Sequence, residues 1–409
     1  MNEQKVSLRV QIRMIESQEY RKQKKPMPSE VFVSQVLSKY WTMDSSRVEI
    51  KRLDSYDDAN FYIKYDMSSF LLKVYNNCDC ELPDILAGLS TMLRKISASN
   101  ECISVPIPVP IADDSSIDLI FVENCTLSDN SLGKVAVRLF NWIHGNLLAG
   151  SKVNSVIHAD VGCAIGNIYK ALQTFDAPCF HRIHMWDLAQ FHHSYFSLLK
   201  YIDDKGLQTL ITEVYENYKE HVAPIAIASF GHSVIMADCN DANIIVSAAD
   251  PNLICGLIDF SDAIYTWSVN EVAIAMAYGL LSPFGMQHPL LSMGSLLYGY
   301  LLARGVDNGL SDAEIYSILP LMCTRLSISI LVGSYSIQQE PENEYLNVHA
   351  RPARSALRFL WSLDRPLVAQ FLLAIRGLVG DPAGGTGCTE ARVSPLVEKF
   401  FQGVAISVV

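Results

Sequence analysis

The chain has 409 residues, of which half are hydrophobic and 18% are charged, and its net charge at neutral pH is −11. A chain of this length is expected to divide into two lobes, because single cores stop growing near about 250–300 residues. The acidic balance excludes a basic field that would attract nucleic acid or an anionic membrane surface, so we expect small or cationic partner molecules.

The ten cysteines are scattered, and their spacing fits neither a zinc site nor a redox Cys-x-x-Cys pair. Reduced thiols are typical of the cytoplasm, where we expect the protein to reside. The first residues also lack the apolar region of a signal peptide. The histidines between residues 144 and 193 have no ligand spacing with a supporting acid, so no transition-metal site is predicted.

The first segment, residues 1–27, is polar and basic, with a cluster of cations over 21–25 ahead of two prolines. Such a segment predicts an exposed or disordered arm without chemistry of its own. A helix is then predicted to begin at Pro28, with Val33 and Tyr40 at helical spacing on its apolar face.

Five short runs rich in β-branched and aromatic residues, separated by polar turns, predict an antiparallel sheet. They lie at 48–53, 60–65, 69–75, 118–122 and 134–140. Between the third and fourth runs, residues 83–96 predict a helix, because proline is tolerated in a first helical turn. This order of strands and helix is that of a kinase N-lobe, which we place at residues 28–142.

After Gly145 the pattern becomes mainly helical, and we predict a C-lobe over residues 143–365 with a C-terminal extension over 366–409. The fold class is therefore α+β, with an antiparallel sheet plus helix in the N-terminal lobe and a mainly helical C-terminal lobe. The apolar stretch 271–302 is interrupted by prolines, which predicts buried helices, because a membrane span needs about 20 apolar residues.

Two serine–glutamate pairs, Ser268 with Glu271 and Ser311 with Glu314, have the spacing of capping boxes at the starts of long apolar helices. For Glu271 we expect this structural role rather than a catalytic one. The glycine-rich segment 381–388 has no strand before it and no Lys-Ser/Thr after it. It is therefore predicted to be a loop and not a phosphate cradle.

The strongest functional signal is an acid followed five residues later by an asparagine, and then a second acid beside apolar strand residues. These residues are Asp238, Asn243 and Asp259. Phosphoryl transfer needs an acid within reach of the acceptor hydroxyl, and it needs an amide and an acid that hold Mg²⁺ through oxygen ligands. We therefore predict Asp238 as the catalytic base and the other two as metal ligands. The runs 244–246 and 255–258 are expected to form the hairpin that brings Asp259 to Asn243.

A cation is also needed near the nucleotide phosphates. Lys73 lies in the apolar third strand, where a buried ammonium needs an anionic partner, and we predict that it binds the phosphates. The loop 54–60 joins the first two strands and contains no glycine. Phosphate contacts must therefore come from the Ser55 hydroxyl, the Asn60 side chain or backbone N–H groups. The alternative is an ordinary turn beside a strand lysine whose amine lies in water.

Several segments in combination resemble the hydroxylysine kinases, a family within the aminoglycoside phosphotransferase/choline kinase group. They are Ser55-Tyr-Asp-Asp-Ala-Asn60-Phe, Leu72-Lys73, Val234-Ile-x-x-Asp238-x-Asn-x-x-Asn243-Ile, Asp259-Phe-x-Asp262, Glu271-Val-Ala-Ile-Ala-Met-Ala-Tyr278 and Tyr335-x-x-x-x-x-Pro341-Glu-Asn-Glu-Tyr345-Leu. The resemblance extends over about residues 30–365. It implies a two-lobed protein-kinase-like fold.

The resemblance also implies transfer of the γ-phosphate of GTP, with ATP as the alternative donor, to the hydroxyl of 5-hydroxy-L-lysine in the cytoplasm. Mg²⁺ is the implied metal, bound by Asn243 and Asp259. The segment 139–145 would be the hinge whose backbone contacts the purine, with Asn141 and Ile143 as the contacting residues.

Three positions depart from the family pattern. The family has His-Gly-Asp where this chain has Met236-Ala-Asp, and methionine replaces the packing of the histidine but not its hydrogen bond. The helix after Lys73 has Ala87 where a glutamate would face that lysine, and Asp84, one turn earlier, is expected to substitute. Ser261 replaces the glycine that usually follows Asp-Phe, which stiffens the metal loop.

The residues leave the acceptor open. Acids such as Asp241 and Asp262 suit a small cationic hydroxylated amine or amino acid, and Arg325 or Arg182 could meet an amino-acid carboxylate. One alternative is a choline- or aminoglycoside-type kinase. Another is a catalytically impaired, nucleotide-binding protein that retains the fold, which the three departures suggest.

Overall fold

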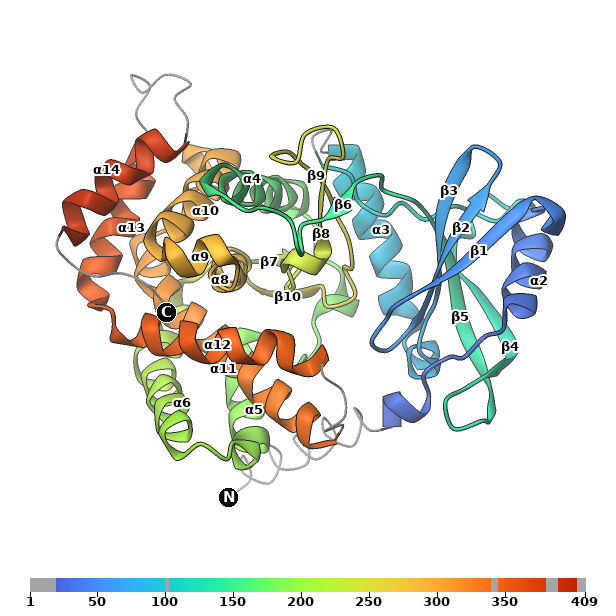
Figure 1. Cartoon of the computed structure of the whole chain (residues 1–409), viewed down its shortest axis with the longest axis horizontal. Helices are drawn as coiled ribbons and strands as arrows, with labels where there is room; N and C mark the ends of the chain where they lie inside the picture. Colours follow the sequence, from blue (N-terminus) through green and yellow to red (C-terminus); the bar gives the residue numbers. More distant parts are fainter. Residues whose placement is uncertain (1–19, 100–102, 340–344, 380–388, 403–409) are drawn as a thin grey trace. The chain divides into compact units, whose positions relative to one another are not determined.

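The structure, a computed structural model, describes residues 20–99, 103–339, 345–379 and 389–402. Within them the chain forms two compact units (Figure 1). The first unit ends at His144 and the second begins at Gly145, except that Ser99 and Ile103 group with the second. The predicted glycine-rich loop at 381–388 lies outside the described residues.

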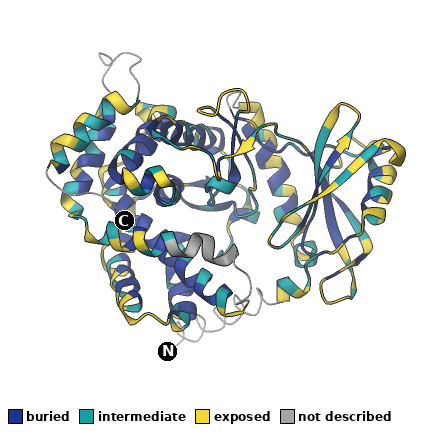
Figure 2. Ribbon diagram, viewed as in Figure 1, coloured by how far each residue is buried: buried dark blue, intermediate teal, exposed yellow. Residues whose placement is uncertain are grey.

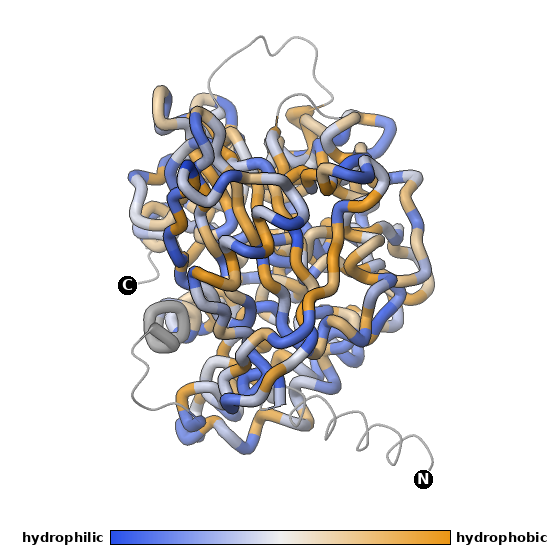
Figure 3. Tube along the Cα trace, turned by 90° about the vertical axis from the view of Figure 1, so that its right-hand side faces the viewer, coloured by the Kyte–Doolittle hydropathy of each residue, from blue (hydrophilic) through white to orange (hydrophobic). Residues whose placement is uncertain are grey.

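An antiparallel sheet with the strand order β1-β2-β3-β5-β4 forms the body of the first unit. Its strands are β1 (Val48–Leu53), β2 (Ala59–Tyr65), β3 (Ser68–Val74), β4 (Ile120–Thr126) and β5 (Leu132–Asn141). Hydrophobic and hydrophilic stretches alternate along the trace of the chain (Figure 3). Within β2, Ala59, Phe61 and Ile63 are buried on one face of the sheet. The predicted sheet is confirmed, although β4 begins at Ile120 and not at Asp118.

Two helices, α2 (Glu30–Trp41) and α3 (Pro83–Ser99), cover the sheet. The apolar side of α2 shares one core with the strands and contributes Val33, Val36, Leu37 and Trp41. Val137 and Leu139 of β5 join that core, whereas the buried Arg138 between them donates a hydrogen bond to the Leu86 carbonyl of α3 (2.9 Å). The two helices therefore lie on opposite faces. Lys73 pairs with Arg138 across β3 and β5, so its side chain lies on the α3 face.

Residues 20–27, the described part of the predicted N-terminal arm, are bound to the first unit and are not a free segment. Arg21 forms ion pairs with Asp57 and with Asp79 (2.7 Å), and Lys24 forms one with Asp129 (2.6 Å). Pro26 makes a β-bridge with Leu127. The basic composition predicted exposure, but these cations meet acids that lie far away in the sequence, and the pairs hold the segment in place.

The second unit is mainly helical, as predicted. Its helices are α4 (Ser155–Leu172), α5 (Phe191–Leu198), α6 (Lys205–Asn217), α7 (Ala223–Ser229), α8 (Val269–Gly279), α9 (Pro283–Gln287), α10 (Pro289–Arg304), α11 (Asp312–Gln339), α12 (Tyr345–Ser362), α13 (Arg365–Val379) and α14 (Thr389–Phe401). Its strands are β6 (Asn146–Leu147), β7 (His232–Ile235), β8 (Ile244–Val246), β9 (Ile254–Leu257) and β10 (Ile264–Trp267). They form two small antiparallel sheets, β6-β8-β9 and β10-β7.

Helix α11 is the core helix of the second unit. It is long and apolar enough to cross a membrane by length and composition, but 83% of its most hydrophobic stretch is buried inside the protein (Figure 2). Its start carries the predicted capping box, because the Ser311 N–H donates to Glu314 Oε2 (2.8 Å) and the Glu314 N–H donates to Ser311 Oγ (3.2 Å). The apolar stretch 271–302 forms α8, α9 and α10, which are largely buried.

Helices α4 and α10 pack with their backbones in near contact. A Cβ atom added at Gly299 of α10 would lie 1.9 Å from the Ala159 carbonyl oxygen of α4, and one added at Gly162 of α4 would lie 2.1 Å from the Leu296 carbonyl oxygen. Both distances are far below van der Waals contact, so only glycine permits this approach.

We expect Gly299→Ala to destabilise the second unit by about 1–3 kcal/mol or more, because the two helices must separate to admit the methyl group. Gly377 lies inside α13 with open space around its Cα. Gly377→Ala is therefore the matched control, and it should stabilise by up to about 1 kcal/mol through helix propensity. Urea unfolding of both variants measures the difference, and equal midpoints would contradict the close packing of α4 and α10.

Candidate active site

The loop that follows β7 brings Asp238 and Asn243 together. After β7 the chain continues through buried Met236 and Ala237, and a short helical turn over 241–243 leads into β8. Asn240 caps this turn by accepting a hydrogen bond from the Ala242 N–H (2.9 Å). The loop therefore folds back on itself, and Asn243 Nδ2 donates to both Asp238 Oδ2 (2.9 Å) and the Asp238 carbonyl oxygen (3.0 Å).

Three groups fix the carboxylate of Asp238. Its Oδ2 accepts hydrogen bonds from the side-chain amides of Asn243 and Asn240 (2.8 Å for the latter). Its Oδ1 accepts one from Arg325 (2.9 Å), a fully buried arginine of α11. Burial raises the pKa of Asp238, while Arg325 and the two asparagines lower it. The carboxylate is thus held in one orientation by partners from two elements.

The predicted hairpin is present, since β8 pairs with β9, and it places Asp259 beside the same loop. The Ile258 N–H donates to the Asn243 carbonyl oxygen (2.9 Å), which joins the two metal-ligand candidates through the backbone. Asp259 has a left-handed backbone (φ 58°), and its Oδ1 accepts the Ser261 hydroxyl (2.6 Å). The charge of Asp259 contributes to raising the pKa of Asp238, so the two carboxylates are electrostatic neighbours.

The side-chain oxygens of Asn243 and Asp259 suit a divalent cation whose other ligands are water and the phosphates of a bound nucleotide. The Asn243 amide nitrogen is committed to Asp238, which leaves its oxygen as the donor atom, and Asp259 adds a carboxylate. Burial, followed by the charges of Asp238 and Asp259, raises the pKa of Asp262 to about 7. Among the described residues, no group of three or more His, Cys, Asp and Glu side chains forms a complete metal cage. Two protein ligands are usual for Mg²⁺ that is bound together with phosphates.

Glu271 does not cap its helix, so the predicted capping box with Ser268 is wrong. Its buried Oε2 instead accepts the Met236 N–H (2.6 Å), and the Ser268 side chain makes no cap hydrogen bond. Burial raises the pKa of Glu271 to about 7, although the Met236 and Ala237 N–H groups lower it. Glu271 therefore braces the loop at the position where the family histidine is missing. It also supports Ala237, which has the left-handed backbone (φ 67°) that usually requires glycine.

We expect Glu271→Gln to flatten the pH dependence of stability. Because the folded pKa of Glu271 lies near 7, above its unfolded value of 4.5, folding carries no charge penalty below pH 4.5 and an increasing one as pH rises through 7. At about 1.4 kcal/mol per pKa unit, the wild type should lose a few kcal/mol from this group between pH 5 and pH 8. The glutamine keeps the acceptor oxygen without the charge. Urea unfolding at both pH values tests this, and parallel losses in the two proteins would contradict it.

The two arginines that were expected to meet an acceptor carboxylate are bound to the protein. Arg325 contacts Asp238, and it also donates to Tyr278 Oη (2.7 Å) and to the Trp186 carbonyl oxygen (3.2 Å). Arg182 donates to the carbonyl oxygens of Ser261 (2.7 Å) and Ala263, and it therefore supports the loop after Asp259. Both guanidinium groups already have partners within the protein, and a contact of either one with an acceptor carboxylate stays a prediction.

In the first unit, the structure assigns Lys73 a different partner from the one expected. Its Nζ lies 2.8 Å from Asp58 Oδ2, whereas Asp84 is exposed at the start of α3. Ser55 Oγ donates to the Asp58 carbonyl oxygen (2.5 Å), and the buried Asn60 Oδ1 has no hydrogen-bond partner. Asn60 pairs directly with Lys73 across β2 and β3. The predicted phosphate residues Lys73, Ser55 and Asn60 therefore lie close together, and Asp84 does not join them.

The predicted hinge segment, residues 139–145, begins within β5 and continues beyond its end. Asn141 ends β5, and its N–H donates to the Ile107 carbonyl oxygen (3.0 Å). Ile143 follows in a half-buried position. The Asn141 N–H is thus already used within the protein, and a purine cannot take a hydrogen bond from it without displacing Ile107.

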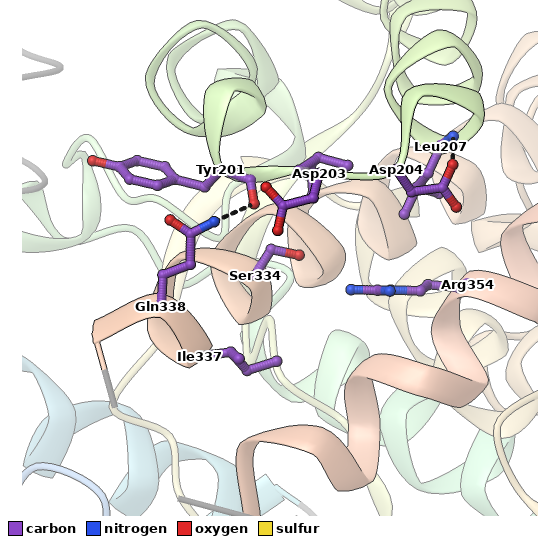
Figure 4. A pocket seen from close by; sticks show the side chains of 9 residues that line it. Tyr201, Asp203, Asp204, Leu207, Ser334, Ile337, Gln338 and Arg354 are labelled. Atoms are coloured by element: carbon purple, nitrogen blue, oxygen red, sulfur yellow. Dashed lines mark hydrogen bonds between the residues drawn. The ribbon is translucent and has the colours of Figure 1, made fainter. Parts of the chain in front are cut away.

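A pocket with an empty volume of about 390 Å³ lies between the α5–α6 connection and helices α11 and α12 (Figure 4). Its lining includes Tyr201, Asp203, Asp204, Ser334, Gln338 and Arg354. Gln338 donates to the Tyr201 carbonyl oxygen (3.1 Å). Ser334 lies about 13 Å further along α11 than Arg325, at 1.5 Å per residue. None of the predicted site residues lines this pocket, so it is separate from the cluster around Asp238.

Known proteins resemble this chain in sequence and in fold. Residues 49–290 match the model of a family described as "Phosphotransferase enzyme family". Hydroxylysine kinase from Xenopus laevis is 28% identical over 344 residues, which cover 78% of this chain and 87% of that protein. The sequence similarity therefore covers most of both proteins and is not confined to the loop that contains Asp238.

Two solved structures share the fold. A microcompartment-associated aminopropanol kinase aligns with a TM-score of 0.63 at 16% identity and covers 81% of this chain and 98% of its own. The amicoumacin kinase hAmiN, in complex with AMP-PNP, Ca²⁺ and Ami, aligns with a TM-score of 0.61 at 16% identity and covers 86% and 98%. The predicted kinase-like α+β fold is thereby confirmed.

Proposed function

Because this chain belongs to the phosphotransferase enzyme family, a kinase family that acts on hydroxyl groups, we propose the following reaction for it. The γ-phosphate of GTP or ATP is transferred to the side-chain hydroxyl of 5-hydroxy-L-lysine or a similar small hydroxylated amine. The main support is the convergence of Asp238, Asn243 and Asp259 on one loop and one hairpin. The similarity to hydroxylysine kinase supports the acceptor.

Asp238 acts as the catalytic base in this proposal. A carboxylate oxygen has two lone pairs, and Oδ2 already accepts two N–H groups, whereas among the described residues Oδ1 accepts a hydrogen bond from Arg325 alone. We therefore assign Oδ1 as the atom that orients the acceptor hydroxyl and takes its proton. Asn243 and Asp259 would hold Mg²⁺, which neutralises charge on the phosphates when bound. Lys73, Ser55 and Asn60 would contact the phosphates from the first unit.

The charge around Asp238 favours a cationic acceptor. Burial, followed by the charges of Asp238 and Asp259, raises the pKa of Asp262, and an ammonium group near these acids would offset their repulsion. A small amine or amino acid, and neither nucleic acid nor a membrane surface, is therefore the proposed partner beside the nucleotide. The cytoplasm is the proposed location, because the cysteines are scattered along the sequence without a paired spacing, and reduced thiols are typical of that compartment.

A coupled assay of the purified protein with MgGTP and with MgATP tests the proposal. The acceptors to compare are 5-hydroxy-L-lysine, choline, ethanolamine and an aminoglycoside, and competition by 5-hydroxy-L-lysine identifies the preferred class. We expect turnover with hydroxylysine or a close analogue. Turnover with choline and with no other acceptor would show that the protein is a kinase for choline and not for hydroxylysine. Nucleotide binding without turnover on any acceptor would support the catalytically impaired alternative.

A further inference from the structure

The buried cation on the α3 face of the sheet, Lys73, is paired with an acid from an unexpected element. Lys73 is only 9% exposed, and a buried ammonium is costly without an anion beside it. In protein kinases that anion is a glutamate of the helix that follows the lysine strand. Here that helix is α3, whose acid Asp84 is exposed, and the ion pair of Lys73 is formed with Asp58 (2.8 Å) from the β1–β2 loop.

Asp58 is held firmly on the side away from the lysine. Its Oδ1 accepts the Asn76 N–H (2.8 Å) while its Oδ2 faces Lys73, so each oxygen has its own partner. Asn76 is fully buried, and its side-chain amide donates to Asp57 Oδ1 (2.7 Å) and to the Arg21 carbonyl oxygen (2.9 Å). The Asp58 carboxylate therefore cannot rotate without breaking a buried network.

The same loop is fixed from the N-terminal segment, which compensates for its lack of glycine. Lys25 Nζ donates to the carbonyl oxygens of Ser55 (2.5 Å) and Tyr56 (3.0 Å). Asp57, next to Asp58, pairs with Arg21 and not with Lys73. The two adjacent acids therefore bind different cations, since Asp57 binds Arg21 of the N-terminal segment and Asp58 binds Lys73.

We propose that Asp58 is the positioning residue of Lys73, in the role that a helix glutamate has in protein kinases. This inference rests on the proposed function, because it assumes that Lys73 binds the nucleotide phosphates. The β1–β2 loop then carries the Ser55 hydroxyl and the anion that directs the lysine, and the start of β2, directly after it, carries the Asn60 amide. Displacement of this loop therefore weakens all three phosphate contacts together.

Nucleotide binding by the full chain tests this role without any need for turnover. Isothermal titration with MgGTP and with MgATP is carried out on the wild type, Asp58→Asn, Lys73→Met and the double variant. Asp58→Asn retains an oxygen for the Asn76 N–H and removes only the charge. We expect its Kd to rise about tenfold, and the double variant to bind no more weakly than Lys73→Met alone.

Two further variants separate positioning from general effects. Asp54→Asn makes the same change at an exposed acid of the same loop and should leave the Kd within about twofold. Asp58→Glu keeps the charge and should recover part of the affinity, including where Asp58→Asn fails to fold. In turnover assays, Asp58→Asn should raise the KM for the nucleotide and leave the KM for the acceptor unchanged.

The possible results distinguish this inference from the proposed function. The role of Asp58 is overturned if Asp58→Asn binds nucleotide with the wild-type Kd. It is also overturned if Asp58→Asn raises the Kd as much in the Lys73→Met protein as in the wild type. Both results leave the kinase assignment intact. Tighter binding by Asp58→Asn also overturns the role of Asp58, since the acid would then be masking the lysine. If the wild type binds neither nucleotide, the proposed function falls, and this inference falls with it.

Discussion

Asp238→Asn is expected to lower turnover by about 10²–10⁴-fold while the protein still binds nucleotide, because the proposed general base is lost and the proposed metal ligands remain. The asparagine keeps one oxygen for hydrogen bonds but cannot accept the proton of the acceptor hydroxyl. Steady-state kinetics with the best acceptor, together with titration of MgGTP and MgATP, measures both effects. The loss should appear in kcat and not in the KM for the nucleotide.

Asp250→Asn is the matched control for that experiment. Asp250 is an exposed acid on the turn between β8 and β9, and its carboxylate accepts only the Asn252 N–H among the hydrogen bonds of the described residues. Its turnover should equal that of the wild type. A fully active Asp238→Asn would remove Asp238 from the catalytic role, and a variant that has lost nucleotide binding as well would point to disruption of the loop and not of the base.

Arg325→Met should destabilise the second unit by about 3–5 kcal/mol, the usual result when one member of a buried ion pair is removed. Arg325 is 0% exposed, its guanidinium lies over the rings of Trp186 (4.7 Å) and Tyr278 (5.0 Å), and it donates to Asp238. Methionine replaces much of the volume but leaves the Asp238 carboxylate without a counter-charge. Since Arg325 lowers the pKa of Asp238, the acidic limb of the pH–rate profile should also move to higher pH.

A double-mutant cycle tests whether the cost arises from the ion pair. Asp238→Asn with Arg325→Met removes both charges, so the double variant should be more stable than Arg325→Met alone. Urea unfolding of the four proteins gives the coupling energy. Additive losses would show that Arg325 stabilises the unit by packing against the aromatic rings and not through Asp238. Arg325→Lys should lie between the wild type and the methionine variant, because it keeps the charge and loses the planar contacts.

Features that depend on neighbouring residues were predictable from the sequence. The alternation along β2, the proline that opens α3 and the capping box of Ser311 with Glu314 all follow from local rules, and the structure contains each of them. The spacing from Asp238 to Asn243 also predicted a loop that folds back, because five residues suffice for it. The same local rules failed for Glu271, whose capping partner at Ser268 was the wrong one.

The missed contacts are all tertiary. Glu271 and Met236 are separated by 35 positions, and Arg325 and Asp238 by 87, so no local pattern pairs them. One signal was present in the sequence, since an acid inside the apolar run of α8 must find a buried donor. Asp58 was overlooked because the expectation for Lys73 followed the helix position of the kinases, whereas the structure uses the loop.

The attachment of residues 20–27 has a practical meaning for anyone who shortens this protein. Trimming the chain to the start of α2, at Glu30, would remove Arg21, Lys24 and Lys25. Asp57 and Asp79 would then repel each other without a shared cation, next to the loop that reaches Lys73. We therefore expect the shortened protein to bind nucleotide poorly even when it folds, because the β1–β2 loop has lost the cations that hold it in place.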